Sequence, residues 1–491
     1  MNCLSTVKHR IQSAQPTVLV VAMVAVLGSC GNDSEPEEAD EPAALTDGKL
    51  LIEHNSTDED TGFQGFADGD PWNLLTLGDA AQAQVLTVNP KGGLLDFGLT
   101  ELFFETSEPE NAEVPIEQVL ARLLEGTYEF QGDMVDDDAS STTTSFRHRI
   151  PAGAELVRPP DGATGVDPQD TVIAWRPVTQ DIHGASINIV GYQVIVEEDA
   201  PSEFPSGFAR PLFSIFLPAS ATRVAIPVEF MEDDTCYSYE VLAIEESGNQ
   251  TLASAAFETG MGCNNEGPPE NPDPHMTEAK LLIEHNATDQ DTGFQGFADG
   301  DPWNFLAIRG PGQVEVLTVN PKGGLFNFGL TELFFETSEP ENAEIPIEQV
   351  LARLPAGTYS FSGDMVDGET STVTTTLTHK IPTEPVLESP TDGATGIDPS
   401  NTVIAWQPVT QDIHGQAVEI VGYQVIVEED VDPAFPQGFS RPLFSVHLPA
   451  AATSVRVPVE FGEGGKTYAY EVLAIEKSGN QTLSSATFSA R

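Results

Sequence analysis

Positive charge is scarce in this sequence. Its 491 residues include 21 Lys and Arg against 77 Asp and Glu, which gives a formal net charge of −56 at pH 7. Such a chain repels phosphate backbones and anionic lipid faces, so nucleic-acid binding by the globular part is disfavoured. The composition suits an acidic secreted protein in a medium whose counterions screen the charge, but it identifies no ligand.

Catalytic motifs are absent as well. The sequence contains no HExxH or HxH spacing, no GxSxG elbow, no phosphate loop and no dinucleotide-binding fingerprint. Glu101 and Glu105 could form a carboxylate pair for glycoside hydrolysis, yet their segment is predicted to be a strand that carries both as ordinary sheet residues on one face. We therefore predict that the protein is not an enzyme. The recurring histidines are each isolated in the sequence: His54, His148, His183, His285, His379 and His414.

A long apolar run occurs only near the N-terminus. Residues 8–10 are basic, and residues 18–27 are apolar but too few for a mature membrane-spanning helix. The string Leu27-Gly28-Ser29-Cys30 then resembles the lipobox of bacterial lipoproteins. That resemblance implies cleavage before Cys30 and a lipid anchor on it, and because Gly31 is not the aspartate that retains such proteins at the inner membrane, it implies the outer membrane. Plain secretion after cleavage near Ser29 is the alternative.

The rest of the chain is one unit written twice. Residues 46–260 recur as residues 277–491 at a constant offset of 231, so that Trp72 matches Trp303. Two copies indicate a recent tandem duplication and not a many-repeat solenoid. The expected organisation is a signal peptide (1–29), an acidic tether (30–45), a first module (46–152 and 277–383), a second module (153–260 and 384–491) and a linker between the copies (261–276).

The second module of each unit consists of short alternating runs bounded by Pro, Gly, Asp and Asn, a pattern typical of an antiparallel β-sandwich. Trp175, Tyr192 and Tyr237 stand where fibronectin type III domains carry a core tryptophan, a third-strand aromatic and a corner tyrosine. The module therefore resembles that family, which implies that these aromatics fill a core. The second copy repeats them as Trp406, Tyr423 and Tyr468.

The first module is also mainly β. Its one helical pattern lies at residues 115–123, where apolar residues fall at i, i+3, i+4 and i+7 behind a proline. The fold class predicted for the whole chain is all-β: four antiparallel β-sandwich modules in tandem, two of them fibronectin type III or Ig-like, with one short helix in each of the other two.

Cysteine is nearly absent, with four in the chain. Cys3 leaves with the signal peptide and Cys30 carries the lipid, so Cys236 and Cys263 remain. Pairing of the last two strands around the turn at residues 246–251 puts the partner of Cys236 near residue 261, close to Cys263. A disulfide is expected, since two free thiols, the alternative, fit an exported protein poorly.

An acid-rich string, TDEDTGFQGFADGDPWN, spans residues 57–73 and returns at 288–304. Short aspartate spacings and glycines predict a loop whose oxygens could hold Ca²⁺ in a flexible cage. The alternative is a solvated turn in which aspartates cap backbone N–H groups while Phe63, Phe66 and Trp72 anchor the loop to the core. The candidate ligands are Asp58, Asp60, Asp68, Asp70, Asp289, Asp291, Asp299 and Asp301.

These patterns favour a non-catalytic binding or scaffold lipoprotein, stiffened by calcium if the acidic loops bind it, in adhesion or cell-envelope organisation. Its partners would be the membrane, through the lipid anchor, and a protein or glycan ligand. The alternative function is a carbohydrate-binding accessory protein of the cell surface, in which exposed Trp72 and Trp303 stack on sugar rings.

Overall fold

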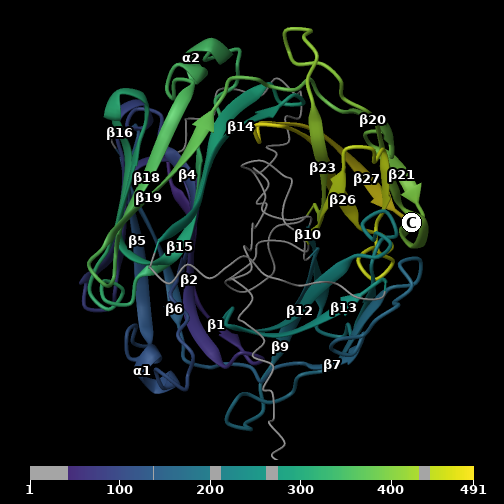
Figure 1. The fold of residues 1–491 in the computed structure, drawn as a ribbon, viewed down its shortest axis with the longest axis horizontal. Coiled ribbons are helices and arrows are strands. Elements are labelled where there is room, and N and C mark those ends of the chain that lie inside the picture. Colours follow the sequence, from purple (N-terminus) through teal and green to yellow (C-terminus); the bar gives the residue numbers. More distant parts are fainter. Residues whose placement is uncertain (1–42, 137, 199–211, 261–274, 431–442) are drawn as a thin grey trace, which may run out of the picture.

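The computed structural model confirms an all-β chain (Figure 1). In the part that it describes, the α-helices are α1 (Ile116–Leu120) and α2 (Ile347–Leu351), one in each first module as predicted. No described helix is long and apolar enough to cross a membrane. The signal peptide and Cys30 lie outside the described residues, which are 43–136, 138–198, 212–260, 275–430 and 443–491.

Each first module contributes six strands. In the first copy these are β1 (Leu45–Asn55), β2 (Asp60–Gly78), β3 (Gln84–Pro90), β4 (Leu99–Thr106), β5 (Gly126–Met134) and β6 (Ala139–Phe146). Their counterparts in the second copy are β14 (Met276–Asn286), β15 (Asp291–Arg309), β16 (Glu315–Pro321), β17 (Leu330–Thr337), β18 (Gly357–Met365) and β19 (Thr370–Leu377).

The second modules follow with shorter outer strands. The first copy has β7 (Glu155–Arg158), β8 (Val172–Arg176), β9 (Ile189–Glu198), β10 (Leu212–Pro218), β11 (Arg223–Ala225), β12 (Cys236–Glu245) and β13 (Gln250–Glu258). The second copy has β20 (Val386–Ser389), β21 (Ala394–Ile397), β22 (Val403–Gln407), β23 (Ile420–Glu429), β24 (Leu443–Pro449), β25 (Ser454–Arg456), β26 (Thr467–Glu476) and β27 (Gln481–Ala490).

Each second module is a fibronectin type III-like, Ig-type sandwich. In the first copy, a three-stranded sheet of order β7-β8-β11 packs on four strands of order β10-β9-β12-β13. Trp175, Tyr192 and Tyr237 are buried in the core between these sheets. The backbone N–H of Glu232 donates to the Tyr237 hydroxyl (2.7 Å), which is the tyrosine-corner contact. The core role predicted for these aromatics is confirmed.

The long strands of both copies join into one closed sheet around a central axis (Figure 1). Within each copy, β1 pairs in parallel with β13, and β14 with β27, which links the first module to the second. Between the copies, β4 pairs with β17 and β10 with β24. The order around the closed sheet is β1-β2-β4-β17-β15-β14-β27-β26-β23-β24-β10-β9-β12-β13 and back to β1.

The junctions between the copies are symmetric. Phe103 pairs with Phe334, Ser214 with Ser445, and, in the outer layer, Val88 with Val319. In all three pairs the partners are equivalent residues of the two copies. The surface is therefore isologous, as in a two-fold dimer, although one chain supplies both halves.

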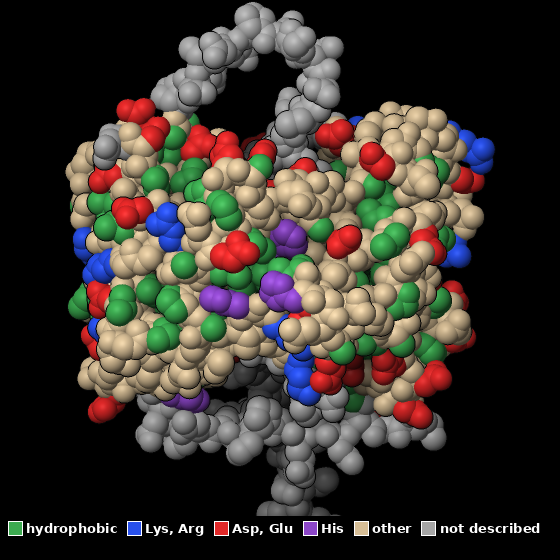
Figure 2. Space-filling view, turned by 90° about the horizontal axis from the view of Figure 1, so that it is seen from above, with side chains coloured by type: hydrophobic (Ala, Val, Ile, Leu, Met, Phe, Trp, Pro, Cys, Tyr) green, Lys and Arg blue, Asp and Glu red, His purple; other side chains and the backbone are tan. Residues whose placement is uncertain are grey.

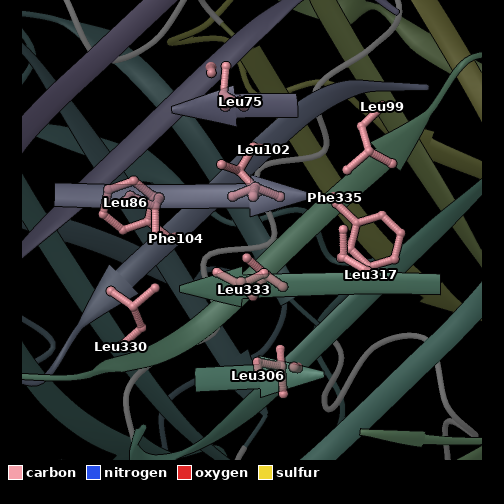
Figure 3. Close-up of a cluster of buried hydrophobic side chains, with 14 of the residues drawn as sticks. Leu75, Leu86, Leu99, Leu102, Phe104, Leu306, Leu317, Leu330, Leu333 and Phe335 are labelled. Atoms are coloured by element: carbon pink, nitrogen blue, oxygen red, sulfur yellow. The ribbon is translucent and has the colours of Figure 1, made fainter. Parts of the chain in front are cut away.

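The first modules share one core. An outer sheet of order β6-β5-β2-β3-β16-β15-β18-β19 runs across both copies and covers the part of the closed sheet that the first modules contribute. Figure 3 shows side chains of both copies in the cluster between the layers, among them Leu102, Phe104, Leu333 and Phe335. The count of four independent modules in tandem is not confirmed, because the first modules of the two copies are halves of one sandwich.

The repeated acidic string is a strand, so the loop interpretation of residues 57–73 is wrong apart from the turn at 56–59. Residues 60–69 of β2 pair with β1 and β4 in the closed sheet, and residues 72–78 pair with β3 and β5 in the outer sheet. The strand changes layer at Gly69-Asp70-Pro71. There the backbone N–H of Asp70 donates to the carbonyl of Ala44 (2.9 Å), and the N–H of Ala44 donates to the Asp70 carboxylate (2.9 Å).

This corner predicts that Gly69→Ala destabilises the protein. A Cβ at residue 69 would lie 2.5 Å from the carbonyl oxygen of Ala44 and 2.6 Å from Cα of Leu45, both backbone atoms that cannot rotate away. We expect a loss of about 1–3 kcal/mol in the free energy of unfolding, measured by urea titration. Gly78→Ala is the control, because its Cβ would meet nothing nearer than 3.9 Å. Equal stability of the two variants would contradict the close approach at the corner.

Candidate functional site

The aspartates predicted as calcium ligands do not come together. Asp58 lies in the β1–β2 turn and Asp60 begins β2, whereas Asp68 and Asp70 lie at the layer-changing corner. Eight residues of strand separate Asp60 from Asp68, about 26 Å of rise. The described residues contain no group of three or more His, Cys, Asp or Glu side chains placed to hold a metal ion. A site made from all four aspartates is thus not present there, and calcium binding stays a prediction. The equivalent aspartates, Asp289, Asp291, Asp299 and Asp301, are placed in the same way.

The alternative prediction for this string fits better. Asn55 accepts from the backbone N–H groups of Thr57 (2.9 Å) and Asp58 (3.1 Å), and Asp70 caps the N–H of Ala44. Trp72 is 0 % exposed, as is Trp303 in the second copy. The proposal that these tryptophans stack on sugars is wrong, because both rings lie inside the shared core of the first modules.

Of the two cysteines in the predicted disulfide, Cys236 lies in the described residues. Cys236, the first residue of β12, is bonded in a disulfide. It lies opposite Glu258 in the register of β12 and β13, three residues before the position expected, because the turn is tighter and Gln250 already belongs to the strand. Cys263 lies outside the described residues, so its pairing with Cys236 stays a prediction.

The inward face of the closed sheet carries rows of buried acidic, aromatic and lysine side chains. Along each strand, alternate residues such as Leu102 and Phe104 enter the shared core, so Glu101, Phe103 and Glu105 point to the opposite face, the interior. Three rows of side chains cross the strands that the first modules contribute, the central row over six strands and each acid row over four. The central row is Lys49, Phe66, Phe103, Phe334, Phe297 and Lys280, and the two acid rows are Gln64, Glu105, Glu332 and Asp299 on one side and Asp68, Glu101, Glu336 and Gln295 on the other.

Carboxylates of the two copies face each other across the β4–β17 junction. Glu105 lies directly opposite Glu332, and Glu101 lies directly opposite Glu336. All four side chains are buried. Like charges at directly opposite positions of a sheet destabilise it, so this arrangement requires protonation or a counter-charge.

Burial raises the pKa of all four glutamates well above the ordinary range, and negative neighbours add to the effect. The negative neighbour with the largest effect is Glu336 on the pKa of Glu101 and Glu105 on the pKa of Glu332. The carboxyl groups of the acid rows therefore keep their protons to higher pH than exposed carboxyl groups do.

Glutamine side chains connect the acid rows to the second modules. The Gln64 amide donates to Glu105 (3.1 Å), and the Gln250 amide of β13 donates to Gln64 (3.2 Å) and to Glu53. The second copy repeats the network, with Gln295 donating to Glu336 (3.2 Å). These bonds lie where β1 meets β13, so they couple the acid rows to the joint between modules.

Lysines occupy both ends of the central row. The Lys49 ammonium lies 5.1 Å from the centre of the Phe66 ring, and Lys280 lies 4.6 Å from that of Phe297. Each lysine also forms an ion pair within its own strand, Lys49 with Asp47 (2.9 Å) and Lys280 with Glu278 (3.1 Å). Their charge is thereby matched locally.

The opposite wall of the interior, from the second modules, carries apolar side chains together with buried polar and acidic ones such as Gln193, Gln424 and Glu471. Two small clusters of inward side chains, separate from the sandwich cores, lie on it: Ile195, Leu212, Phe216, Leu242, Ile244 and Leu252 in one, and Ile426, Leu473 and Leu483 in the other. His447 of β24 lies on the same face, and burial lowers its pKa to about 4.

The described surface outside the closed sheet carries scattered acidic side chains and fewer Lys and Arg (Figure 2).

The sequence predicted the two glutamates of β4 on one face of a strand, and this is confirmed. It missed that this face is buried and meets the same face of the second copy. The signal was present in ELFFE, because both faces of that strand carry large apolar residues. A strand covered on one side alone would alternate more cleanly between polar and apolar residues.

No protein-family model and no curated protein matches the chain. Similar solved structures include the tetra-tandem repeat in the extending region of a large adhesion protein (12% identity, 91% of this chain and 99% of that one, TM-score 0.15). Others are the FN1–FN3 domains of chicken CNTN1 (12% identity, 70% and 99%, TM-score 0.18) and the fibronectin(III)-like modules of Clostridium thermocellum CbhA (10% identity, 43% and 94%, TM-score 0.18). At these TM-scores the likenesses carry no argument about function, and the fold assignment rests on strand topology.

The buried acids predict that stability falls as pH rises. Burial, followed by the charge of Glu240, raises the pKa of Glu53 from 4.5 to about 8, and burial raises that of Glu284 to about 7. The folded state binds these protons more tightly, so their stabilisation is complete below pH 4.5 and is lost as pH rises through about 7 to 8. Thermal unfolding of Glu53→Gln/Glu284→Gln between pH 4.5 and 8.5 should show a shallower decline of Tm than the unmodified protein.

The matched control is Glu113→Gln/Glu344→Gln, which changes two equivalent exposed glutamates of the first modules. This control should keep the full decline of Tm with pH. If both double variants follow the same curve as the unmodified protein, Glu53 and Glu284 do not carry the proton linkage.

Proposed function

We propose that this protein is a non-catalytic binding or scaffold protein of the cell surface, acting in adhesion or cell-envelope organisation. The observation that carries the proposal is the closed sheet. Three antiparallel junctions between the copies make one body from the duplicated unit, and the described strands of its closed sheet are all paired on both sides. A structure joined in this way suits a protein that binds a partner or spaces other components at the cell surface.

The placement of the candidate catalytic groups supports a non-catalytic role. The His54 ring bonds to the carbonyl of Asp60 (2.8 Å), and the His148 ring bonds to that of Leu123 (2.7 Å). Both imidazole rings are thus engaged in hydrogen bonds with backbone carbonyls. General acid–base catalysis needs a titratable group within hydrogen-bond reach of a substrate, and these two point into the fold.

A glycan-binding role is the weaker candidate. It depended on exposed rings of Trp72 and Trp303, and both are fully buried. The remaining large aromatics of the second modules, among them Trp175 and Trp406, are buried as well.

A lipid anchor on Cys30 would hold the protein at the membrane. The lipobox-like sequence that ends at Cys30 supports this anchor. In a bacterial host with an outer membrane, Cys30→Ser should move the protein from the membrane fraction to the soluble fraction, because a single thiol carries the acyl chains. Fractionation with immunoblotting measures this. A Ser variant that stays with the membrane as fully as the unmodified protein would remove the anchor from the proposal.

The adhesion role has its own test. Cells that display the unmodified protein should attach to a surface or to partner cells more than cells without it, and Cys30→Ser cells should lose that gain although they make the same amount of protein. Attachment counted under flow gives the measurement. Equal attachment of all three strains would exclude adhesion and leave a scaffold role within the envelope.

A further inference from the structure

The middle of the central row consists of phenylalanine rings flanked by the carboxylates of the acid rows, and it contains no Lys, Arg or His side chain of the described residues. Phe103 and Phe334 lie opposite each other on the two-fold axis, between the Glu101–Glu336 pair and the Glu105–Glu332 pair. Toward the ends of the same row, Lys49 and Lys280 place ammonium groups near the outer phenylalanines, beside carboxylates. The protein thus uses an ammonium, an aromatic ring and a carboxylate together at both ends of the row.

The central carboxylates have no ion-pair partner, although the charge of Lys49 acts on Glu101 and that of Lys280 on Glu332 from a distance. Among the described residues, no ion pair joins Glu101, Glu105, Glu332 or Glu336 to a Lys, Arg or His side chain. Glu332 is 1 % exposed, and neither of its carboxylate oxygens has a hydrogen-bond partner in this part of the chain. A buried acceptor in that condition costs free energy until a donor reaches it.

The closed sheet is wide enough to have an interior of its own. A closed sheet of about eight strands is just filled by its own inward side chains, and larger ones enclose more space. In the described part of the chain, the ring of pairings that closes this sheet contains fourteen strands. The opposite wall carries the two apolar clusters beside buried acidic groups such as Glu471, so the interior suits a molecule that combines positive charge with hydrocarbon.

We propose that the interior of the closed sheet binds a linear aliphatic polyamine, with one terminal ammonium between Glu105 and Glu332, the other between Glu101 and Glu336, and its methylene chain over Phe103 and Phe334. The two glutamates of β4 are four residues apart, about 13 Å along the strand, a span that an extended polyamine of spermine length covers. A ligand with two like ends matches a site with a two-fold axis. The inference goes beyond the proposed surface role and does not depend on the anchor.

Binding has a defined proton balance. Each carboxyl group that pairs with an ammonium loses its proton to the buffer, and no covalent bond forms or breaks. The calorimetric heat of binding should therefore vary with the ionisation enthalpy of the buffer and report net proton release. Affinity should rise from pH 5 to pH 8, because fewer protons then have to be displaced.

The test is isothermal titration of the full chain with spermine at about 0.15 M salt, which screens general attraction to the acidic surface. We expect saturable binding with one spermine per chain. In Glu105→Gln/Glu332→Gln the affinity should fall about tenfold or more, because one ammonium loses both of its charged acceptors. Glu113→Gln/Glu344→Gln removes the same charge from the exposed surface and should bind spermine within about twofold of the unmodified protein.

Ligand length gives a second test on the unmodified protein, which applies even if an interior variant folds poorly. 1,3-Diaminopropane is too short to reach both carboxylate pairs and should bind at least about tenfold more weakly than spermine, and Mg²⁺ should not displace spermine at equal charge. Equal weakening in both double variants, equal affinity for the short diamine, or the absence of saturable binding would overturn the proposal and leave only counterion attraction.

Discussion

The antiparallel pairing of β4 with β17 is the interaction on which the rest of the structure depends. It joins the two inner sheets of the first modules, and with the β10–β24 pairing it closes the sheet. Without it, the cluster that contains Leu102 and Leu333 would be split into two halves, each with an open edge strand. A duplicated unit with a self-complementary edge avoids that exposure by pairing with its own copy.

The same register creates the chemistry of the interior. Because the pairing is centred on Phe103 and Phe334, a residue two places before the centre on one strand faces the residue two places after it on the other. Both of those positions are glutamate in each copy. The symmetric pairing therefore places two pairs of opposed carboxyl groups on either side of the two phenylalanines. Each pair needs bound protons or a cation to offset the repulsion between its carboxylates.

The sequence pattern correctly predicted the features that depend on interactions between residues a few positions apart. The short helix behind Pro115, the buried Trp175 and the corner contact of Tyr237 were all accessible, since proline geometry, strand alternation and turn residues act over a few positions. The string around Asp60 to Trp72 misled the interpretation, because glycines that permit a loop also permit close approach within a bent strand. Gly65 lies under the Phe104 ring, where a Cβ would stand 2.2 Å from ring atoms.

The sequence by itself determined the strand-rich composition, the duplication and the aromatic cores of the second modules, because these depend on side-chain periodicity within one unit. Only the tertiary structure decided that Glu101 and Glu105 face Glu336 and Glu332 inside a closed sheet. Strand pairing between distant segments is set by which edges meet and in what register, and neither is written in the period of a single strand.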